Sequence, residues 1–152
     1  MQCTLIFKEK ENMSLMNRSI HLTTKLYQKR VPFIPRIMQW FNRAMFSTDI
    51  PKSVKIGKGT KFAHSGLGCV IHERTIIGEN CKILQNVTIG GNSKGGTPVI
   101  KDNVLIGAGA TIIGNVTIGD NAKIGAMSLV LDDVPANAVI VANKGQTLER
   151  NK

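Results

Sequence analysis

Two residues in the first half of the chain have the types and the spacing needed for proton transfer. His64 opens the glycine-rich stretch 64–68, and histidine is the side chain whose charge changes near neutral pH. Asp49 precedes it by 15 residues. In a coil with three six-residue sides, this separation returns the chain to nearly the same corner, one layer away, so we expect the Asp49 carboxylate to orient the imidazole. A structural histidine is the alternative, because a lone histidine is more often structural than catalytic.

Aliphatic residues that recur with a period of six predict the elements that must position these two residues. Between residues 100 and 134 an aliphatic residue stands at every sixth position, and a small or β-branched residue follows four places later. The leading positions are Ile100, Ile106, Ile112, Ile118, Ile124 and Val130. An α-helix would need a period of 3.6 and a simple strand a period of 2, so the pattern predicts short strands joined by tight turns in a solenoid.

The same register begins earlier and is broken twice. Ile77, Ile83 and Ile89 form a first run. The glycine-rich stretch 63–75 interrupts the register before this run, and residues 90–99 form a polar, glycine-rich excursion after it. An excursion of this composition cannot pack like a strand, so we expect it to project as a loop, where solenoids usually carry function.

Two helices are predicted before the solenoid. Apolar spacing favours a helix from Ser14 to Arg30 with Ser14 as N-cap, and a second helix from Arg36 to about Phe46. The prolines in 31–35 separate the two. We therefore expect an N-terminal helical segment over 1–48, a β-helix domain over 49–140 and a C-terminal tail over 141–152.

Composition limits the classes of function. The 152 residues carry a net charge of +10 and only 5% aromatic residues, which suits one β-branched solenoid rather than an aromatic core. Residues 1–48 hold eight Lys and Arg against two Glu. Three cysteines are too few for a disulfide or zinc framework, so no metal is expected. No nucleic-acid partner is expected either, because the lysines of 52–61 lack an aromatic platform or a motif.

The absence of a spanning apolar run and of a signal-peptide pattern predicts a cytoplasmic protein. The basic segment 18–43, which contains the Trp, leaves open a peripheral contact with the inner membrane surface. Helices packing beneath an oligomer, with a solvated basic face, are the alternative.

Several motifs resemble the serine O-acetyltransferase family. They are the stretch 49–64 with Asp49 and His64, Ile83-Leu84-Gln85-Asn86-Val87-Thr88-Ile89-Gly90-Gly91, Ile106-Gly107-Ala108-Gly109-Ala110, Ile124-Gly125-Ala126 and Asp133-Val134-Pro135. The resemblance covers about residues 49–140. It implies a left-handed parallel β-helix, assembled as a homotrimer with active sites between subunits, and an acetyl-CoA-dependent acyltransferase.

The resemblance also implies roles for individual residues on the acceptor side. His64 matches the general base that deprotonates an acceptor hydroxyl, which then attacks the acetyl thioester directly, and Asp49 matches the acid that orients this histidine. Glu73 matches a Glu close to the acceptor pocket. His72 occupies a Gly position of the family near that pocket and joins it as an acceptor-binding candidate, with an ordinary surface histidine as the alternative.

On the coenzyme side, Gly91, Ala108 and Ala126 match positions whose backbone groups line the coenzyme A arm. Lys123 matches a basic residue near the coenzyme phosphates. For each glycine or alanine taken singly, turn geometry alone explains the residue equally well.

Departures from the family pattern bear on the acceptor. Serine-specific members carry Asp just before the catalytic His, where this chain has Ala63, and an Arg-His pair where its shorter loop ends Gly96-Thr97-Pro98. Losing these counter-ions forfeits charge-assisted hydrogen bonds of roughly 1.5–3 kcal/mol each. We therefore expect a sugar hydroxyl in bacterial surface-polysaccharide biosynthesis, similar to the short capsule and exopolysaccharide sugar O-acetyltransferases. The alternatives are a serine O-acetyltransferase of cysteine biosynthesis and a non-catalytic solenoid assembly module.

Overall fold

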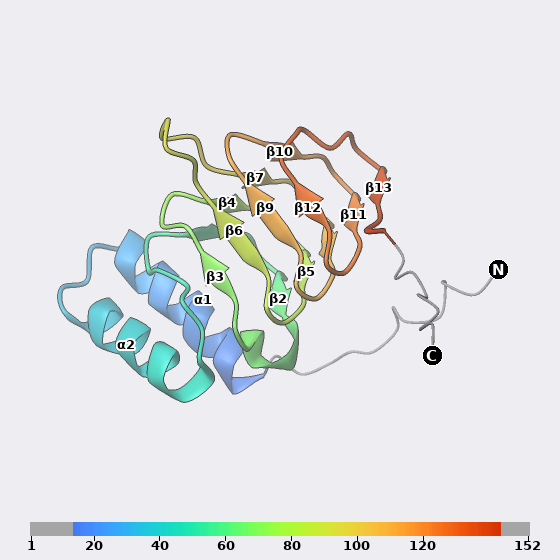
Figure 1. Cartoon of the computed structure of the whole chain (residues 1–152). Helices are drawn as coiled ribbons and strands as arrows, with labels where there is room; N and C mark the ends of the chain where they lie inside the picture. Colours follow the sequence, from blue (N-terminus) through green and yellow to red (C-terminus); the bar gives the residue numbers. More distant parts are fainter. Residues whose placement is uncertain (1–13, 144–152) are drawn as a thin grey trace, which may run out of the picture.

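The structure is a computed structural model and describes residues 14–143. Short parallel strands wind into about four stacked coils, and two helices cover one end of the stack (Figure 1). The predicted parallel β-helix with an N-terminal helical segment is confirmed.

The strands form three parallel sheets, one on each side of the coil. The first sheet contains β1 (Lys55–Ile56), β4 (Ile76–Ile77), β7 (Val99–Ile100) and β10 (Thr117–Ile118). The second contains β2 (Lys61–Phe62), β5 (Lys82–Ile83), β8 (Leu105–Ile106), β11 (Lys123–Ile124) and β13 (Val139–Ile140). The third contains β3 (Val70–Ile71), β6 (Thr88–Gly90), β9 (Thr111–Ile113) and β12 (Leu129–Val130).

The core of the solenoid consists of the residues that recur every six positions. The eight isoleucines from Ile77 to Ile124 in this register are at most 2% exposed. The second residue of each repeat is also buried, from Cys81 through Val104 and Ala110 to Val134. Each strand therefore points one apolar residue inward, an aliphatic in every strand except β2, where it is Phe62, as expected for period-2 strands only two or three residues long.

The coils differ in length, and the differences locate the two breaks in register. Ile100 pairs with Ile118, a coil of 18 residues, whereas Ile77 pairs with Ile100 after 23 and Ile56 pairs with Ile77 after 21. The five extra residues of the longer coil fall in 91–98 and the three extra residues of the earlier coil in 63–69. Both departures from 18 are accommodated at corners, so the strands stay in register.

Two corners of the coil matter for function. The His64 corner joins the second sheet to the third and comprises residues 63–69, 84–87, 107–110 and 125–128. The loop corner follows the third sheet and comprises residues 72–75, 91–98, 114–116 and 131–133. The longest of these segments, 91–98, extends beyond the other turns at the top of the solenoid in Figure 1.

Helix α1 (Leu15–Gln28) and helix α2 (Ile34–Phe46) pack against each other beneath the first coil (Figure 1). Ser14 caps α1 as predicted, since its hydroxyl accepts a hydrogen bond from the Asn17 amide. Helix α2 begins at Ile34 rather than at Arg36. Pro35 lies in its first turn, where the missing N–H is not needed for an intrahelical bond. Neither helix is long and apolar enough to cross a membrane, and the same holds for every helix within residues 14–143.

Candidate functional site

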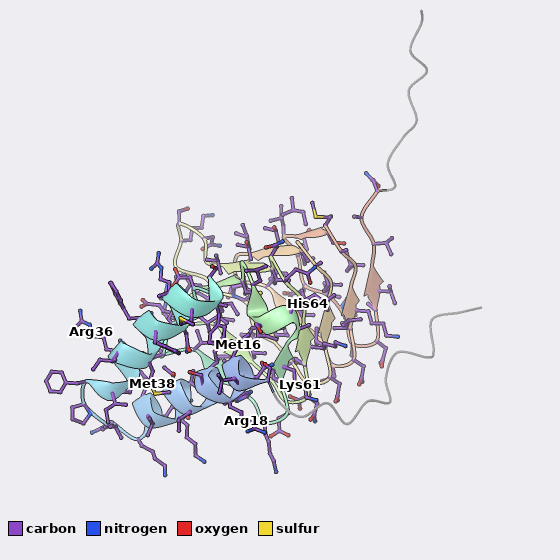
Figure 2. The ribbon with its side chains drawn as sticks, turned by 90° about the horizontal axis from the view of Figure 1, so that it is seen from below. Met16, Arg18, Arg36, Met38, Lys61 and His64 are labelled. Atoms are coloured by element: carbon purple, nitrogen blue, oxygen red, sulfur yellow. The ribbon has the colours of Figure 1, made fainter. Side chains whose placement is uncertain are left out.

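His64 lies in a tight, strained turn at the first corner of the solenoid. The turn covers Ala63–Gly66, directly after β2, and its backbone is kinked and non-helical at its two central residues. His64 and the following Ser65 both have left-handed backbones, with φ of 49° and 56°. This conformation is costly for residues other than glycine, and it also occurs at other turns of the solenoid, such as those of Asn86 and Met127. His64 is exposed, and Figure 2 shows it near the N-terminal end of α1, where Met16 lies.

Helix α1 supports this turn from below. The Asn17 amide is 4% exposed and spans both backbone groups of Phe62, donating to its carbonyl at 3.0 Å and accepting from its N–H at 2.8 Å. Met16, fully buried, lies so close to Gly66 that a Cβ there would come within 2.7 Å of the methionine Cε. The strand before His64 and the glycine after it are therefore both held by α1.

Asp49 reaches the same corner through the backbone. Its amide donates to the Cys69 carbonyl at 2.8 Å, and it forms a parallel bridge with Val70. Its carboxylate lies 3.7 Å from the Arg43 guanidinium, on α2, in a partly exposed ion pair. Within residues 14–143 no hydrogen bond or ion pair joins Asp49 to His64. The orienting role of Asp49 therefore stays a prediction.

Three of the expected coenzyme residues lie along the His64 corner or beside it. Ala108 and Ala126 occupy equivalent turns of successive coils, linked by a hydrogen bond from the Met127 amide to the Ala108 carbonyl at 2.9 Å. These stacked turns form a column. The turn above His64 belongs to it, because the Asn86 amide donates to the Leu67 carbonyl at 2.8 Å. Lys123, exposed, is on the outward face of β11, immediately before the Ala126 turn.

Small residues are required in this column by the stacking itself. A Cβ on Gly107 would lie 2.5 Å from the Ala126 backbone nitrogen, a separation that only glycine avoids. The column consists of hydrogen-bonded main chain and small residues such as Ala108 and Ala126, with Leu67 and Met127 exposed beside them. Such a column suits an extended apolar arm with amide groups along it.

The remaining candidates gather at the loop corner, at the opposite edge of the third sheet. His72 is half-buried, and its Nδ1 accepts a hydrogen bond from the Arg74 amide at 3.2 Å. Gly91 packs against this imidazole, since a Cβ at Gly91 would be 3.2 Å from His72 Nε2. Glu73 has an exposed side chain, and its carbonyl accepts from the Ser53 hydroxyl at 2.9 Å.

The projecting loop 91–98 is closed by its own hydrogen bonds. The Asn92 side-chain oxygen accepts from the amides of Lys94 and Gly96, at 3.1 and 2.9 Å. Asn92 and Gly96 are also joined through their backbones at 3.0 Å. The loop is thus a compact turn, and its neighbour Arg74 approaches the Gly95 position to within 3.9 Å of where a Cβ would stand.

The structure thus divides the predicted residues into two groups. His64, Asp49, Ala108, Ala126 and Lys123 lie at or near the His64 corner, whereas the three others, His72, Glu73 and Gly91, lie at the loop corner. The two corners are separated by the width of the third sheet, as Figure 1 shows for the turn before β3 and the loop after β6. One chain therefore does not bring the proposed base and the acceptor-side residues into contact.

Two features of this site were not predicted from the sequence. The strain at Ser65 has no sequence signal, because serine is not a residue favoured in the left-handed region. The clamp by Asn17 on Phe62 joins residues 45 positions apart, and only the position of Asn17 within an otherwise apolar helix face could have suggested it. Within residues 14–143 no group of three or more His, Cys, Asp or Glu could hold a metal ion.

The two cysteines within residues 14–143 are buried, and their thiols are not activated. Burial raises the pKa of the Cys69 thiol and that of the Cys81 thiol, and hydrogen bonding to backbone amides only partly offsets it. A raised pKa keeps both thiols protonated, so neither is an activated nucleophile. Cys3 lies outside the described residues.

Comparison with known proteins identifies relatives over most of the chain. Residues 97–132 match the bacterial transferase hexapeptide family (six repeats). A serine acetyltransferase of Synechococcus elongatus is 40% identical over 129 residues, which cover 83% of this chain and 52% of that protein. A serine acetyltransferase of Helicobacter pylori is 35% identical over 134 residues, covering 86% of this chain and 78% of the relative.

Solved structures similar to this chain are also serine acetyltransferases. Neisseria gonorrhoeae serine acetyltransferase in complex with serine has a TM-score of 0.76 and 34% identity, covering 87% of this chain and 55% of that one. A serine acetyltransferase in complex with CoA has a TM-score of 0.73 and 36% identity, covering 82% and 51%. The chain thus spans about half the length of several of these relatives. None of them supports the expected closeness to sugar O-acetyltransferases.

Proposed function

We propose, because this chain belongs to the serine acetyltransferase family, that it transfers an acetyl group from acetyl-CoA to an acceptor hydroxyl, with L-serine as the acceptor. The relatives above support serine over the sugar hydroxyl expected from the sequence. The observation that carries the proposal for this chain is His64, exposed on a strained turn at the end of a column of small residues.

In the proposed reaction, the neutral His64 imidazole takes the proton of the acceptor hydroxyl as that oxygen attacks the thioester carbonyl carbon. The C–S bond of the resulting tetrahedral adduct then breaks, and the imidazolium returns its proton to the departing coenzyme A sulfur. The products are the acetyl ester and free coenzyme A, and His64 ends neutral. Asp49 is the proposed positioning residue, favouring the imidazolium once its carboxylate turns from Arg43 toward His64.

Acetyl-CoA is the proposed co-substrate, and the column at the His64 corner is its proposed wall. Ala108 and Ala126 leave room for the pantetheine arm, and their turns carry backbone groups that can bond its amides. Lys123, exposed on the adjacent strand, supplies a positive charge for a phosphate. Gly91 joins the coenzyme site only if the loop corner of another copy approaches.

We propose a homotrimer for this reason. His64 and the acceptor candidates Glu73 and His72 occupy opposite edges of one sheet, so a single chain leaves the site incomplete. In a cyclic trimer, the His64 corner of each subunit can face the loop corner of its neighbour, which repeats the same contact three times. Each of the three sites would then combine a base from one subunit with acceptor-side residues from the next.

A sugar hydroxyl is the second candidate acceptor, and specific residues favour it. Ala63 stands beside His64 without a charge, and the compact loop 91–98 contains no Arg or His. The ammonium of serine therefore lacks a charged partner beside His64, and at the loop its carboxylate would meet Lys94 instead of an Arg-His pair. An acceptor with hydroxyl groups and no charges would not need them.

The test measures coenzyme A release by the full chain from acetyl-CoA with L-serine, with a panel of free and nucleotide-linked sugars, and with water. Serine-dependent release supports the first candidate, and sugar-dependent release in its absence overturns the choice of serine. Failure to bind acetyl-CoA by calorimetry would favour the non-catalytic assembly module instead.

A further inference from the structure

Helix α2 turns its apolar side away from the protein. Ile37, Trp40 and Phe41 are 68%, 77% and 52% exposed, although they are the largest apolar residues of the helix centre. The residues that α2 buries are Pro35 and Asn42. A surface helix of a globular protein normally shows the reverse arrangement, with its apolar stripe toward the core.

The exposed residues form one continuous stripe. They recur at spacings of three and four, which places them on one face of the helix; they are Phe33, Ile37, Trp40, Phe41, Ala44 and Met45. Part of this α2 face is a shallow, open depression of about 460 Å³ lined by Arg36, Ile37, Trp40, Phe41 and Ala44. An apolar patch of this kind, rimmed by charge, marks an interaction surface.

The helical segment that carries the α2 face is basic. Between residues 14 and 48 the chain has six Lys and Arg and no Asp or Glu. Figure 2 shows Arg36 on the outer side of α2 and Met38 between the two helices, so Arg36 accompanies the apolar stripe on its exposed side. A second copy would bring a helical segment of the same net charge sign against this one, which opposes self-association. The occupant that these charges fit is anionic.

We propose that the α2 face binds an anionic lipid surface, with the helix lying in the plane of the interface. Thirteen residues extend about 20 Å along a helix axis, which suffices for lying on a bilayer and not for crossing it. Trp40 and the neighbouring aromatics enter the headgroup boundary, where such rings are favoured. Arg36 extends along the apolar surface to place its guanidinium among lipid phosphates.

Trp40 makes this proposal directly measurable, because it is the only tryptophan in the chain. The full chain is titrated with vesicles of phosphatidylcholine containing about 30% phosphatidylglycerol and with vesicles of phosphatidylcholine alone, and both Trp emission and co-sedimentation are recorded. We expect a blue shift and co-sedimentation with the anionic vesicles, weakened by added salt. Neither is expected with the neutral ones.

Matched substitutions distinguish binding through the α2 face from nonspecific electrostatic attraction to the vesicles. Ile37→Glu places a charge in the apolar stripe, and Leu15→Glu makes the same change at a site 75% exposed on α1. We expect Ile37→Glu to lower the partition coefficient at least tenfold and Leu15→Glu to lower it less than threefold. Circular dichroism checks that both variants remain folded.

Three results would overturn the proposal. The first is a chain that does not bind anionic vesicles. The second is an equal loss of partition coefficient in the two variants. The third is a Trp40 blue shift that depends on protein concentration without vesicles, which would identify a second copy as the occupant. Serine- or sugar-dependent coenzyme A release without vesicles should be the same in Ile37→Glu as in the unmodified chain. The failure of this proposal is therefore distinguishable from failure of the proposed reaction.

Discussion

Replacing Asn17 by Ala should destabilise the protein more than its small volume suggests. The side chain is 4% exposed and satisfies both the N–H and the carbonyl of Phe62, on the edge strand β2. Its removal leaves two buried backbone groups without partners, at about 1–3 kcal/mol for each. We expect a loss of about 3 kcal/mol in the free energy of unfolding, or about 6–12 °C in melting temperature for a chain of this length.

Asn42→Ala is the matched control. Asn42 is equally buried at 4%, but it accepts one hydrogen bond, from the half-buried Ser19 hydroxyl at 2.7 Å. Its loss should cost about 1 kcal/mol, since that hydroxyl can turn to water. Guanidinium unfolding at a single protein concentration compares the variants, because any assembly makes stability concentration-dependent. If Asn17→Ala loses no more stability than Asn42→Ala, the clamp on Phe62 does not support the His64 turn as we describe.

Two further predictions concern backbone strain and the buried thiols. Ser65→Gly should raise the free energy of unfolding by about 0.5–1 kcal/mol, because glycine adopts the φ of 56° without strain; a lower guanidinium midpoint would contradict this. In a Cys3→Ser background, Cys69 and Cys81 should react with a thiol reagent only on unfolding, since burial raises the pKa of both thiols. The folded-state pKa exceeds the unfolded one, so their contribution to stability is complete below the unfolded pKa and is lost as pH rises through the folded pKa. Rapid labelling of the folded protein, or stability that does not fall at alkaline pH, would contradict the assignment.

The repeat could be predicted from sequence because one simple constraint recurs in every coil. Most strands bury a single aliphatic, so residues such as Ile106 and Ile124 reveal their inward direction by spacing alone. The start of α2 was misplaced by two residues, because proline's aversion to helix does not extend to a first turn. Spacing alone does not show whether a given proline lies before a helix or within its first turn.

The candidate site was less predictable, since it depends on tertiary packing. The spacing predicted that Asp49 lies at the corner of His64, and the backbone hydrogen bonds between residues 47–49 and 68–69 place it there. Spacing could not show that Arg43, on α2, would pair with its carboxylate. Nor could it show that His64 and His72 occupy opposite edges of one sheet, because the sides of a triangular coil look identical in a six-residue repeat.

The initial rate of L-serine-dependent coenzyme A release, compared between the unmodified chain and His64→Ala, tests the central claim most directly. Removing a general base should lower this rate by about 10²–10⁴-fold. The oligomeric state by light scattering and acetyl-CoA binding by calorimetry should be unchanged, since His64 is exposed and holds no described side-chain partner. A His64→Ala variant that keeps its rate within tenfold would contradict the account, because the base would then lie elsewhere.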